Sequence, residues 1–277
     1  MGCYASCALP GCVGQGGNIA PTRVLVAGSL EGPLLWYWRS MWDATVEDGV
    51  LDLGGASLIG RLNVPSVDEG PKLFVRDFYP DLASEILSHR KRNAVVTGTP
   101  GIHLSLFSFV FPTIGCSHHT TGVGKTLFRN YMVYHLVQQM KSSGRAVPVI
   151  LHQSPEASVL VVLMASSRGG SWVLQVEIWN IDKFYAATQS WTEFFYLLDV
   201  CNGDISRRIP FAQGRTVMFT SPNQRAYSEF KKQDCAPLYH MPLWTLEELM
   251  AAAAVRGVAV DDDFFMSAFV VMVGFPV

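Results

Sequence analysis

The chain has 277 residues, of which 49% are hydrophobic and only 16% charged, and its formal net charge is −2. This composition excludes a largely disordered protein, and the near-neutral charge gives no electrostatic footprint for wrapping nucleic acid. The mean hydropathy of +0.22 raises the question of a membrane span, but no run reaches the roughly 18 uninterrupted apolar residues that a spanning helix needs. Six cysteines without a C-x-x-C pair favour reduced thiols and hence an intracellular protein.

Residues 1–22 are expected to be a flexible tail rich in Gly, Cys and Pro. The first six residues, MGCYAS, fit the M-G-x-x-x-[ST] pattern for myristoylation of Gly2, and Cys3 could carry a palmitoyl chain as the second anchor. A lipid anchor, an unmodified tail and a mispredicted start codon all remain open as interpretations.

Residues 23–70 form a small N-terminal region that ends at a change in composition near residue 70. Residues 23–30 are strand-like, and residues 54–70 have the Gly, Ser, Pro and Asn content of a connection. Three tryptophans lie between residues 34 and 42. Their rings could stack bases, but only Arg39 is interleaved with them, so core packing is the preferred interpretation.

Residues 71–265 have the pattern of an α/β domain with a mostly parallel sheet, because short buried strands alternate with helices. The strands 158–165 and 171–179 are expected to form a hairpin, and a capping box of Thr245 and Glu248 begins the last helix. Residues 266–277 are expected to be a truncated C-terminal end. In chain order we expect helices at 80–89, 127–139 and 246–256, and strands at 94–97, 147–152, 158–165, 171–179, 194–199 and 216–220.

Two halves of a phosphate-binding loop stand on either side of an uncharged segment. A P-loop needs G-x-x-x-x-G-K-[ST] between a strand and a helix, so that consecutive backbone amides surround phosphate oxygens while Lys contacts the terminal phosphates. The strand 94–97 continues into GTPG at 98–101, and the helix is entered through VGKT at 123–126. Removing residues 102–122 joins these halves into the complete motif. In the unspliced chain, His119 occupies the position of the first glycine.

Segment 102–122, IHLSLFSFVFPTIGCSHHTTG, has no Lys, Arg, Asp or Glu. Its Phe, Ser, Leu and Pro codons can be pyrimidine-rich like the 3′ end of an intron, so we interpret it as a translated retained intron. A genuine loop insertion is the alternative for this segment, and for the whole chain a decayed gene whose product never accumulates is a further interpretation. Lengthening a loop from about 4 to about 25 residues costs only ~1.6 kcal/mol, so the sheet can survive. His118 and His119 cannot easily adopt glycine's conformations, however, and we expect weakened or absent nucleotide binding.

A P-loop enzyme also uses a carboxylate at the end of a neighbouring strand to hold magnesium. Residues 195–199, FYLLD, have four apolar residues followed by Asp199, which is the Walker B form. Asp182 is the second candidate, after a less apolar strand.

The segment after the next strand, TSPN at 220–223, could present Ser221 or Asn223 to a γ-phosphate as a sensor. An ordinary turn is the alternative. The residue that would activate water stays open between Glu177 and Glu193, and a surface role is the alternative for both.

Taken together, five segments resemble the P-loop NTPase module of Crinkler-type and retrotransposon-hot-spot proteins. The resemblance covers roughly residues 70–265 and implies an ATPase-type fold related to the AAA/STAND group. It also implies, for oomycetes and fungi, candidate effectors secreted into host cells. The segments are LFVRDFY at 73–79, the split phosphate loop, LLD at 197–199, TSPN at 220–223 and MPLWTLEEL at 241–249.

The chain departs from this family in three respects. Its phosphate loop is interrupted, and the Leu-rich translocation header expected of Crinkler effectors is missing at the amino terminus. The chain stops at residues 274–277, where family members commonly continue through a Gly-Val-Pro-Arg-like segment. These departures count against secretion and against a complete catalytic cycle.

The resemblance implies ATP and Mg²⁺ as cofactors. Lys125 would offset the β- and γ-phosphate charge, Thr126 and Asp199 would hold Mg²⁺, and a protein partner is not identified. The alternative function is a non-catalytic interaction or effector fragment that keeps the scaffold without binding nucleotide. The expected nucleotide-binding residues are Gly98, Thr99, Pro100, Gly101, Gly124, Lys125 and Thr126, and the expected catalytic residues are Lys125, Asp199, Ser221 and Asn223.

Overall fold

The computed structural model describes residues 23–24, 31–53, 72–89, 92–98, 123–154, 160–168, 171–200, 214–220, 222, 224–255 and 257. Its helices are α1 (Glu31–Asp43), α2 (Tyr79–Ser88), α4 (Val123–Ser143), α5 (Ile181–Thr188), α6 (Gln224–Asp234) and α7 (Leu246–Val255). Its strands are β1 (Arg23–Val24), β2 (Thr45–Glu47), β3 (Val50–Asp52), β4 (Lys72–Phe74), β5 (Asn93–Gly98), β6 (Val149–Ser154), β7 (Leu160–Arg168), β8 (Ser171–Trp179), β9 (Phe195–Val200), β10 (Arg215–Thr220) and β11 (Leu238–Met241).

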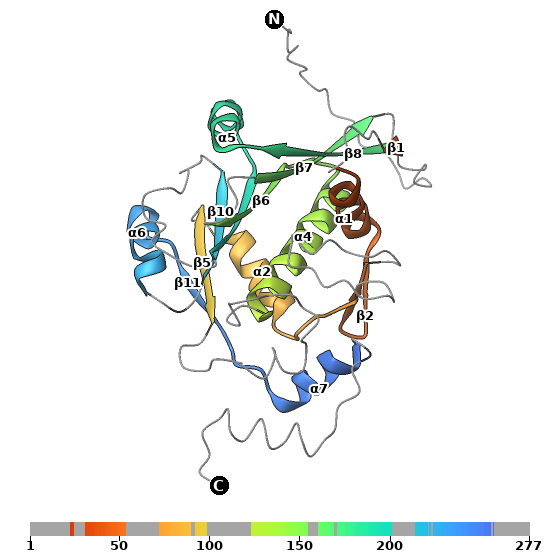
Figure 1. Cartoon of the computed structure of the whole chain (residues 1–277), viewed down its shortest axis with the longest axis vertical. Helices are drawn as coiled ribbons and strands as arrows, with labels where there is room; N and C mark the ends of the chain where they lie inside the picture. Colours follow the sequence, from red (N-terminus) through yellow and green to blue (C-terminus); the bar gives the residue numbers. More distant parts are fainter. Residues whose placement is uncertain are drawn as a thin grey trace, which may run out of the picture.

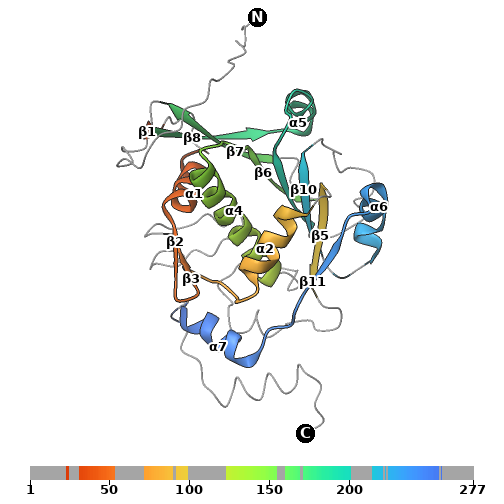
Figure 2. The same ribbon diagram turned by 180° about the vertical axis from the view of Figure 1, so that it is seen from behind.

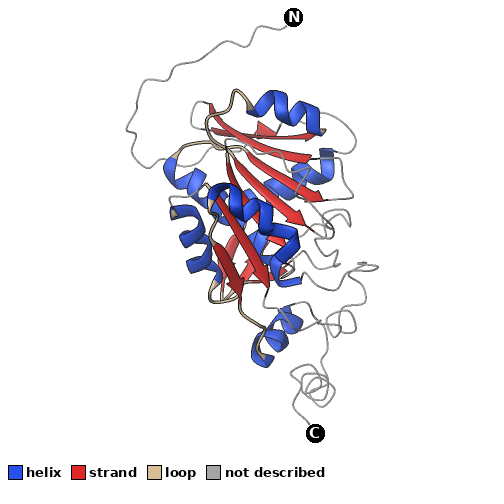
Figure 3. Cartoon of the chain, turned by 90° about the vertical axis from the view of Figure 1, so that its left-hand side faces the viewer, coloured by secondary structure: helices blue, strands red, loops and turns tan. Residues whose placement is uncertain are grey.

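An eight-stranded mixed sheet organises this part of the chain, in the order β1-β8-β7-β6-β9-β10-β5-β11 (Figure 1). The five strands β6, β9, β10, β5 and β11 are parallel to one another, and β7 is antiparallel to β6 and β8. Seen from the side, the strands twist progressively along the sheet (Figure 3). The predicted α/β class and the hairpin of β7 with β8 are confirmed.

Helices cover both faces of this sheet. α1, α2 and α4 lie on one face, whereas α5 and α6 lie on the other (Figures 1 and 2). α4 contacts β5 and β10 directly and is covered in turn by α1 and α2. From the spacing of its apolar residues, the sequence predicts one apolar face at Leu127, Tyr131, Tyr134 and Val137. Because α4 is covered from both sides, it is buried well beyond that face, whereas Tyr134 is only half-buried. The helix also begins four residues before the predicted start at residue 127.

The tryptophan-rich segment forms α1 and packs into the same core as α4. Trp38 and Trp42 are buried, and the Trp38 indole Nε1 donates a hydrogen bond to the carbonyl oxygen of Met164 at 3.0 Å. The rings of Trp42 and Trp172 lie 4.9 Å apart. The packing interpretation of these tryptophans is confirmed.

A second, antiparallel sheet has the strand order β2-β3-β4. Its third strand, β4, lies beyond residue 70, so strand pairing continues across the position where the composition changes. β4 also contacts α7, and Figure 2 shows α7 beside this small sheet. The small sheet therefore connects the N-terminal region to the last described helix.

Several sequence expectations fall outside the described residues. These include the tail 1–22, the connection 54–70, the segment 102–122 and the end 266–277; of the expected strand 23–30, only Arg23 and Val24 are described. Among the helices that are described, none combines the length and apolarity needed to cross a bilayer.

α7 begins with the capping box that the sequence predicts. The backbone amide of Glu248 donates to Thr245 Oγ1 at 3.1 Å, and the backbone amide of Thr245 donates to Glu248 Oε2 at 2.9 Å. Two amides that have no partner within the helix are thereby satisfied, so this prediction is confirmed.

Replacing Thr245 by alanine is expected to lower the free energy of unfolding by about 1 kcal/mol, because one helix amide loses its side-chain acceptor. Thr245→Ser keeps the hydroxyl and should stay close to the parent. Urea denaturation of the three proteins measures the difference. An equal loss in both variants would contradict the capping role of the hydroxyl.

Candidate functional site

The carboxyl ends of the central parallel strands meet at one edge of the large sheet. Thr220 of β10 is paired in register with Thr97, the residue before Gly98 of β5. Thr220 is also paired with Val200, the residue after Asp199 of β9. In the register of these three neighbouring strands, Gly98, Thr220 and Asp199 are therefore offset from one another by at most two residues.

At this edge, the described helices that follow two adjacent strands lie on opposite faces of the sheet. The next described helix after β5 is α4, which packs on one face, and the next described helix after β10 is α6, which packs on the other (Figure 1). In open α/β sheets, ligands bind in the crevice outside the carboxyl ends of the strands at such a point. The edge formed by β5 and β10 is therefore the candidate site.

The first turn of α4 brings Lys125 to the end of β5. The Lys125 side chain is 7% exposed, and its Nζ lies 3.9 Å from the position that a β-carbon on Gly98 would occupy. Gly124 and Thr126, on either side of Lys125, are half-buried. Although residues 99–122 separate the two elements in the chain, the described parts of the split phosphate motif are adjacent in space.

Asp199 forms a buried ion pair with Arg129 of α4. Arg129 Nη1 lies 3.0 Å from Asp199 Oδ2, and the side chains are 5% and 8% exposed respectively. Asp182, the second carboxylate candidate, is exposed in the first turn of α5. Sequence reasoning missed Arg129, although it follows Lys125 by four residues and so shares its helix face.

A polar atom without a partner lies on the strand between Gly98 and Asp199. Thr220 is fully buried, and its Oγ1 has no hydrogen-bond partner among the described residues. Buried hydroxyls are nearly always hydrogen-bonded to protein, water or a ligand. Thr220 therefore adds a polar group to this edge that the sequence analysis did not single out.

Five of the predicted site residues lie outside the described residues, namely Thr99, Pro100, Gly101, Ser221 and Asn223. Within the described ranges, no group of three or more His, Cys, Asp or Glu side chains could hold a metal ion. A Mg²⁺ ion bound with a nucleotide needs only one or two protein carboxylates, because phosphates and waters supply its other ligands.

The two candidates for activating water lie away from this edge. Glu177 is on β8, three strands from β9. Burial raises the pKa of Glu177, but hydrogen bonds from Lys183 and Trp179 outweigh burial and hold the pKa below its ordinary value. Glu193 precedes the amino end of β9 and forms an ion pair with Arg145 at 2.5 Å. Because a six-residue strand spans about 20 Å, Glu193 stands at the opposite edge of the sheet from Asp199.

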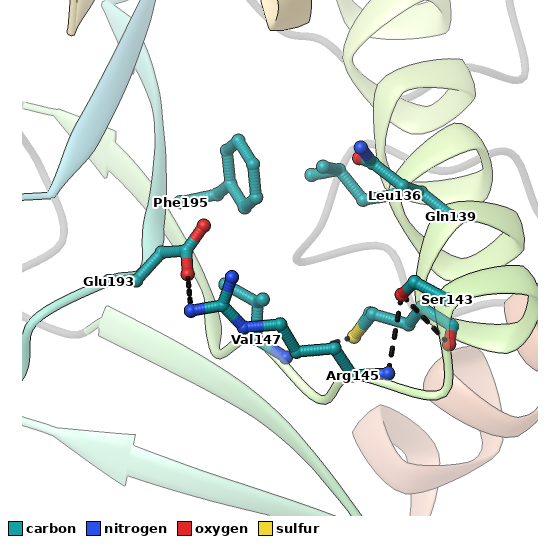
Figure 4. A pocket seen from close by; sticks show the side chains of 8 residues that line it. Leu136, Gln139, Ser143, Arg145, Val147, Glu193 and Phe195 are labelled. Atoms are coloured by element: carbon teal, nitrogen blue, oxygen red, sulfur yellow. Dashed lines mark hydrogen bonds and ion pairs between the residues drawn. The ribbon is translucent and has the colours of Figure 1, made fainter. Parts of the chain in front are cut away.

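A cavity of about 160 Å³ lies beside Glu193, at the far end of α4 from Lys125. Figure 4 shows the Arg145–Glu193 ion pair on one side of it, with Leu136 of α4 and Phe195 of β9 also lining it. It contains none of the residues that the sequence assigns to phosphate or metal binding. The cavity is thus separate from the candidate site.

Comparison with known proteins supports a distant relation to Crinkler effectors. No family model matches the chain. The chain is similar to Crinkler effector protein 15 and Crinkler effector protein 16 of Phytophthora infestans. Each is 24% identical to it over 187 residues, which is 66% of this chain and 24% of the relative. The chain therefore spans about a quarter of the length of these curated relatives.

Breaking the buried ion pair from either side should destabilise the fold. Arg129→Met leaves the Asp199 carboxylate buried without its ion-pair partner, and we expect the free energy of unfolding to fall by about 3–5 kcal/mol. Asp199→Leu should also be costly, whereas the double variant should recover much of the loss, because no unpaired charge remains. Urea denaturation of the four proteins gives the coupling energy. Additive losses would show that the two charges do not depend on each other.

Proposed function

We propose that this chain is an ATP-binding P-loop NTPase module of a Crinkler-like protein, with a phosphate loop impaired by residues 102–122. The observation that carries the proposal is the position of the Lys125 ammonium beside Gly98. The two residues belong to different halves of the split motif, and they meet at the end of a buried parallel strand and the start of a helix. This is the context that a phosphate loop requires.

The order of the strands adds support. β10 lies between β5, which ends at Gly98, and β9, which carries Asp199. The sequence assigns phosphate binding to the end of β5 and metal binding to Asp199. It assigns γ-phosphate sensing to Ser221 or Asn223, directly after Thr220 at the end of β10. The three assignments thus belong to, or follow directly in sequence, three neighbouring parallel strands.

The described residues fit a phosphate group. A helix N-terminus favours negative charge, and Lys125 in the first turn of α4 adds a buried cation. The Thr220 hydroxyl, which has no partner among the described residues, can donate to or accept from a bound ligand or its water. These groups would bind and orient the phosphates of ATP.

The fit to Mg²⁺ depends on Arg129. Asp199 provides the oxygen ligand that Mg²⁺ prefers, and Thr126 provides a hydroxyl. Arg129, however, already donates to Asp199 Oδ2. A metal ion would therefore have to bind the same carboxylate as Arg129, with a water molecule between the ion and the carboxylate, or displace the guanidinium. When bound, Mg²⁺ would supply neutralisation of charge on the β- and γ-phosphates.

A non-catalytic effector or interaction fragment is the second candidate function, and the same ion pair favours it. With Asp199 neutralised by Arg129 in the core, the scaffold can be stable without a metal ion. Under this proposal the α/β fold is kept while nucleotide binding is lost. Secretion into a host cell belongs to either proposal, because the two similar proteins are named as effectors.

Deleting residues 102–122 is expected to strengthen ATP binding by at least about tenfold, which corresponds to about 1.4 kcal/mol, because the amide nest becomes contiguous. Titration with a fluorescent ATP analogue compares the deletion variant with the full chain. Adding Lys125→Ala to the deletion variant should remove the gain.

Lys232→Ala is the matched control, because it removes an exposed lysine of α6 that pairs with Glu229. It should leave the affinity unchanged. Equal ATP binding by the full chain and the deletion variant would show that the segment does not impair the loop. If neither protein binds while both unfold cooperatively on heating, the nucleotide-binding proposal fails and the second candidate is favoured.

A further inference from the structure

Two segments that the sequence resemblance singles out, 73–79 and 241–249, meet around Arg76. The Arg76 side chain is almost fully buried, and its Nε and Nη2 donate to Glu248 Oε1 and Oε2 at 2.9 and 2.8 Å. Its Nη1 and Nη2 also donate to the carbonyl oxygens of Pro242 and Leu243 at 2.9 and 2.6 Å. A guanidinium held by four such bonds has a fixed orientation.

The same guanidinium lies over two aromatic rings. Its Cζ is 4.6 Å from the ring centroid of Phe78 and 4.6 Å from that of Trp244. Cation–π attraction therefore adds to the hydrogen bonds. Since Trp244 follows β11 and Phe78 precedes α2, Arg76 holds together two chain segments that flank the candidate site.

Trp244 in turn lies against the first turn of α4. A β-carbon on Gly124 would be 3.2 Å from Trp244 Nε1, which is closer than side chains normally pack, and 3.4 Å from Met241 Cε, which is an ordinary contact. Glycine at position 124 therefore lets the indole approach the helix backbone. The residue after it is Lys125.

A second contact fixes Gly124 through its carbonyl. Tyr79 Oη donates to the Gly124 carbonyl oxygen at 3.0 Å. Burial raises the pKa of Tyr79, and although the nearby Arg76 charge acts in the opposite direction, the hydroxyl remains protonated and can donate. Gly124 is thus held by an indole on one side and by a tyrosine hydroxyl at its carbonyl.

We propose that Arg76, Tyr79, Trp244 and Glu248, here named the Arg76 support, are positioning residues of the phosphate site. By fixing Gly124, the Arg76 support holds the first turn of α4 so that the Lys125 ammonium stays beside Gly98. The phosphate role rests on the proposed function, whereas the fixing of Gly124 does not. These residues act through Gly124 and Lys125 and do not contact the reacting groups.

Two buried tyrosines provide a matched comparison. Tyr79 and Tyr37 are both fully buried, and each donates one hydrogen bond to α4. Tyr79 bonds Gly124 in the first turn, and Tyr37 bonds Asn130 Oδ1 at 2.8 Å further along the helix. Replacing either by phenylalanine removes one hydroxyl from the core. A purely structural role predicts the same behaviour for both variants.

Hydrogen exchange of the full chain, followed by mass spectrometry, tests the fixing of Gly124. Tyr79→Phe should raise amide exchange at the start of α4 about fivefold, the size expected for one lost buried hydrogen bond. Tyr37→Phe should leave that turn unchanged. Unchanged exchange in Tyr79→Phe, or equal changes in both variants, would overturn the inference.

Affinity for the fluorescent ATP analogue tests the phosphate role, in the full chain and in the variant lacking residues 102–122. Tyr79→Phe should weaken binding severalfold and Tyr37→Phe should not. Trp244→Leu should weaken it and Trp244→Phe, which keeps a ring over Arg76, should restore most of the affinity. Equal affinities across these variants would overturn the positioning role. If neither parent binds, the proposed function fails, and the exchange comparison alone decides whether the Arg76 support fixes the helix.

Discussion

The parallel pairing of β5 with β10 on one side and β11 on the other is the constraint on which the candidate site depends. Because the three strands run in one direction, the chain leaves all of them at the same edge of the sheet. Gly98, Thr220 and the segment leading to Trp244 therefore come together although they are far apart in sequence. The start of α4 lies among them, against Gly98 and Trp244.

The charged groups at this edge are buried, so their positions affect both the stability of the fold and the access of a ligand. Lys125 and Arg129 are one helical turn apart on α4, and both lie in the core with Asp199. A charge removed from water is costly unless it is paired, so the geometry of such groups is tightly specified. The Arg129–Asp199 pair therefore serves the stability of the fold, while its position also determines how much of the carboxylate another cation could reach.

The sequence predicts those features that have a local pattern. The buried runs of β5, β6, β9 and β10, the hairpin and the capping box of α7 follow from apolar runs, glycines and the Thr245–Glu248 spacing. The three-residue strands β2, β3 and β4 are too short to show a period, and the four-residue β11 was missed for the same reason. The pairing of Arg129 with Asp199 and of Trp244 with Gly124 depends on tertiary structure, which no local pattern specifies.

Glu248 has a consequence that reaches beyond α7. One of its oxygens accepts bonds from both the Thr245 amide and Arg76, and the other accepts from Arg76 alone. The start of α7 and the orientation of Arg76 are therefore one cooperative unit rather than two. Arg76 in turn lies under the Trp244 ring, and that indole lies beside Gly124. The start of α7 is therefore linked through two side chains to the edge of the sheet where Lys125 lies.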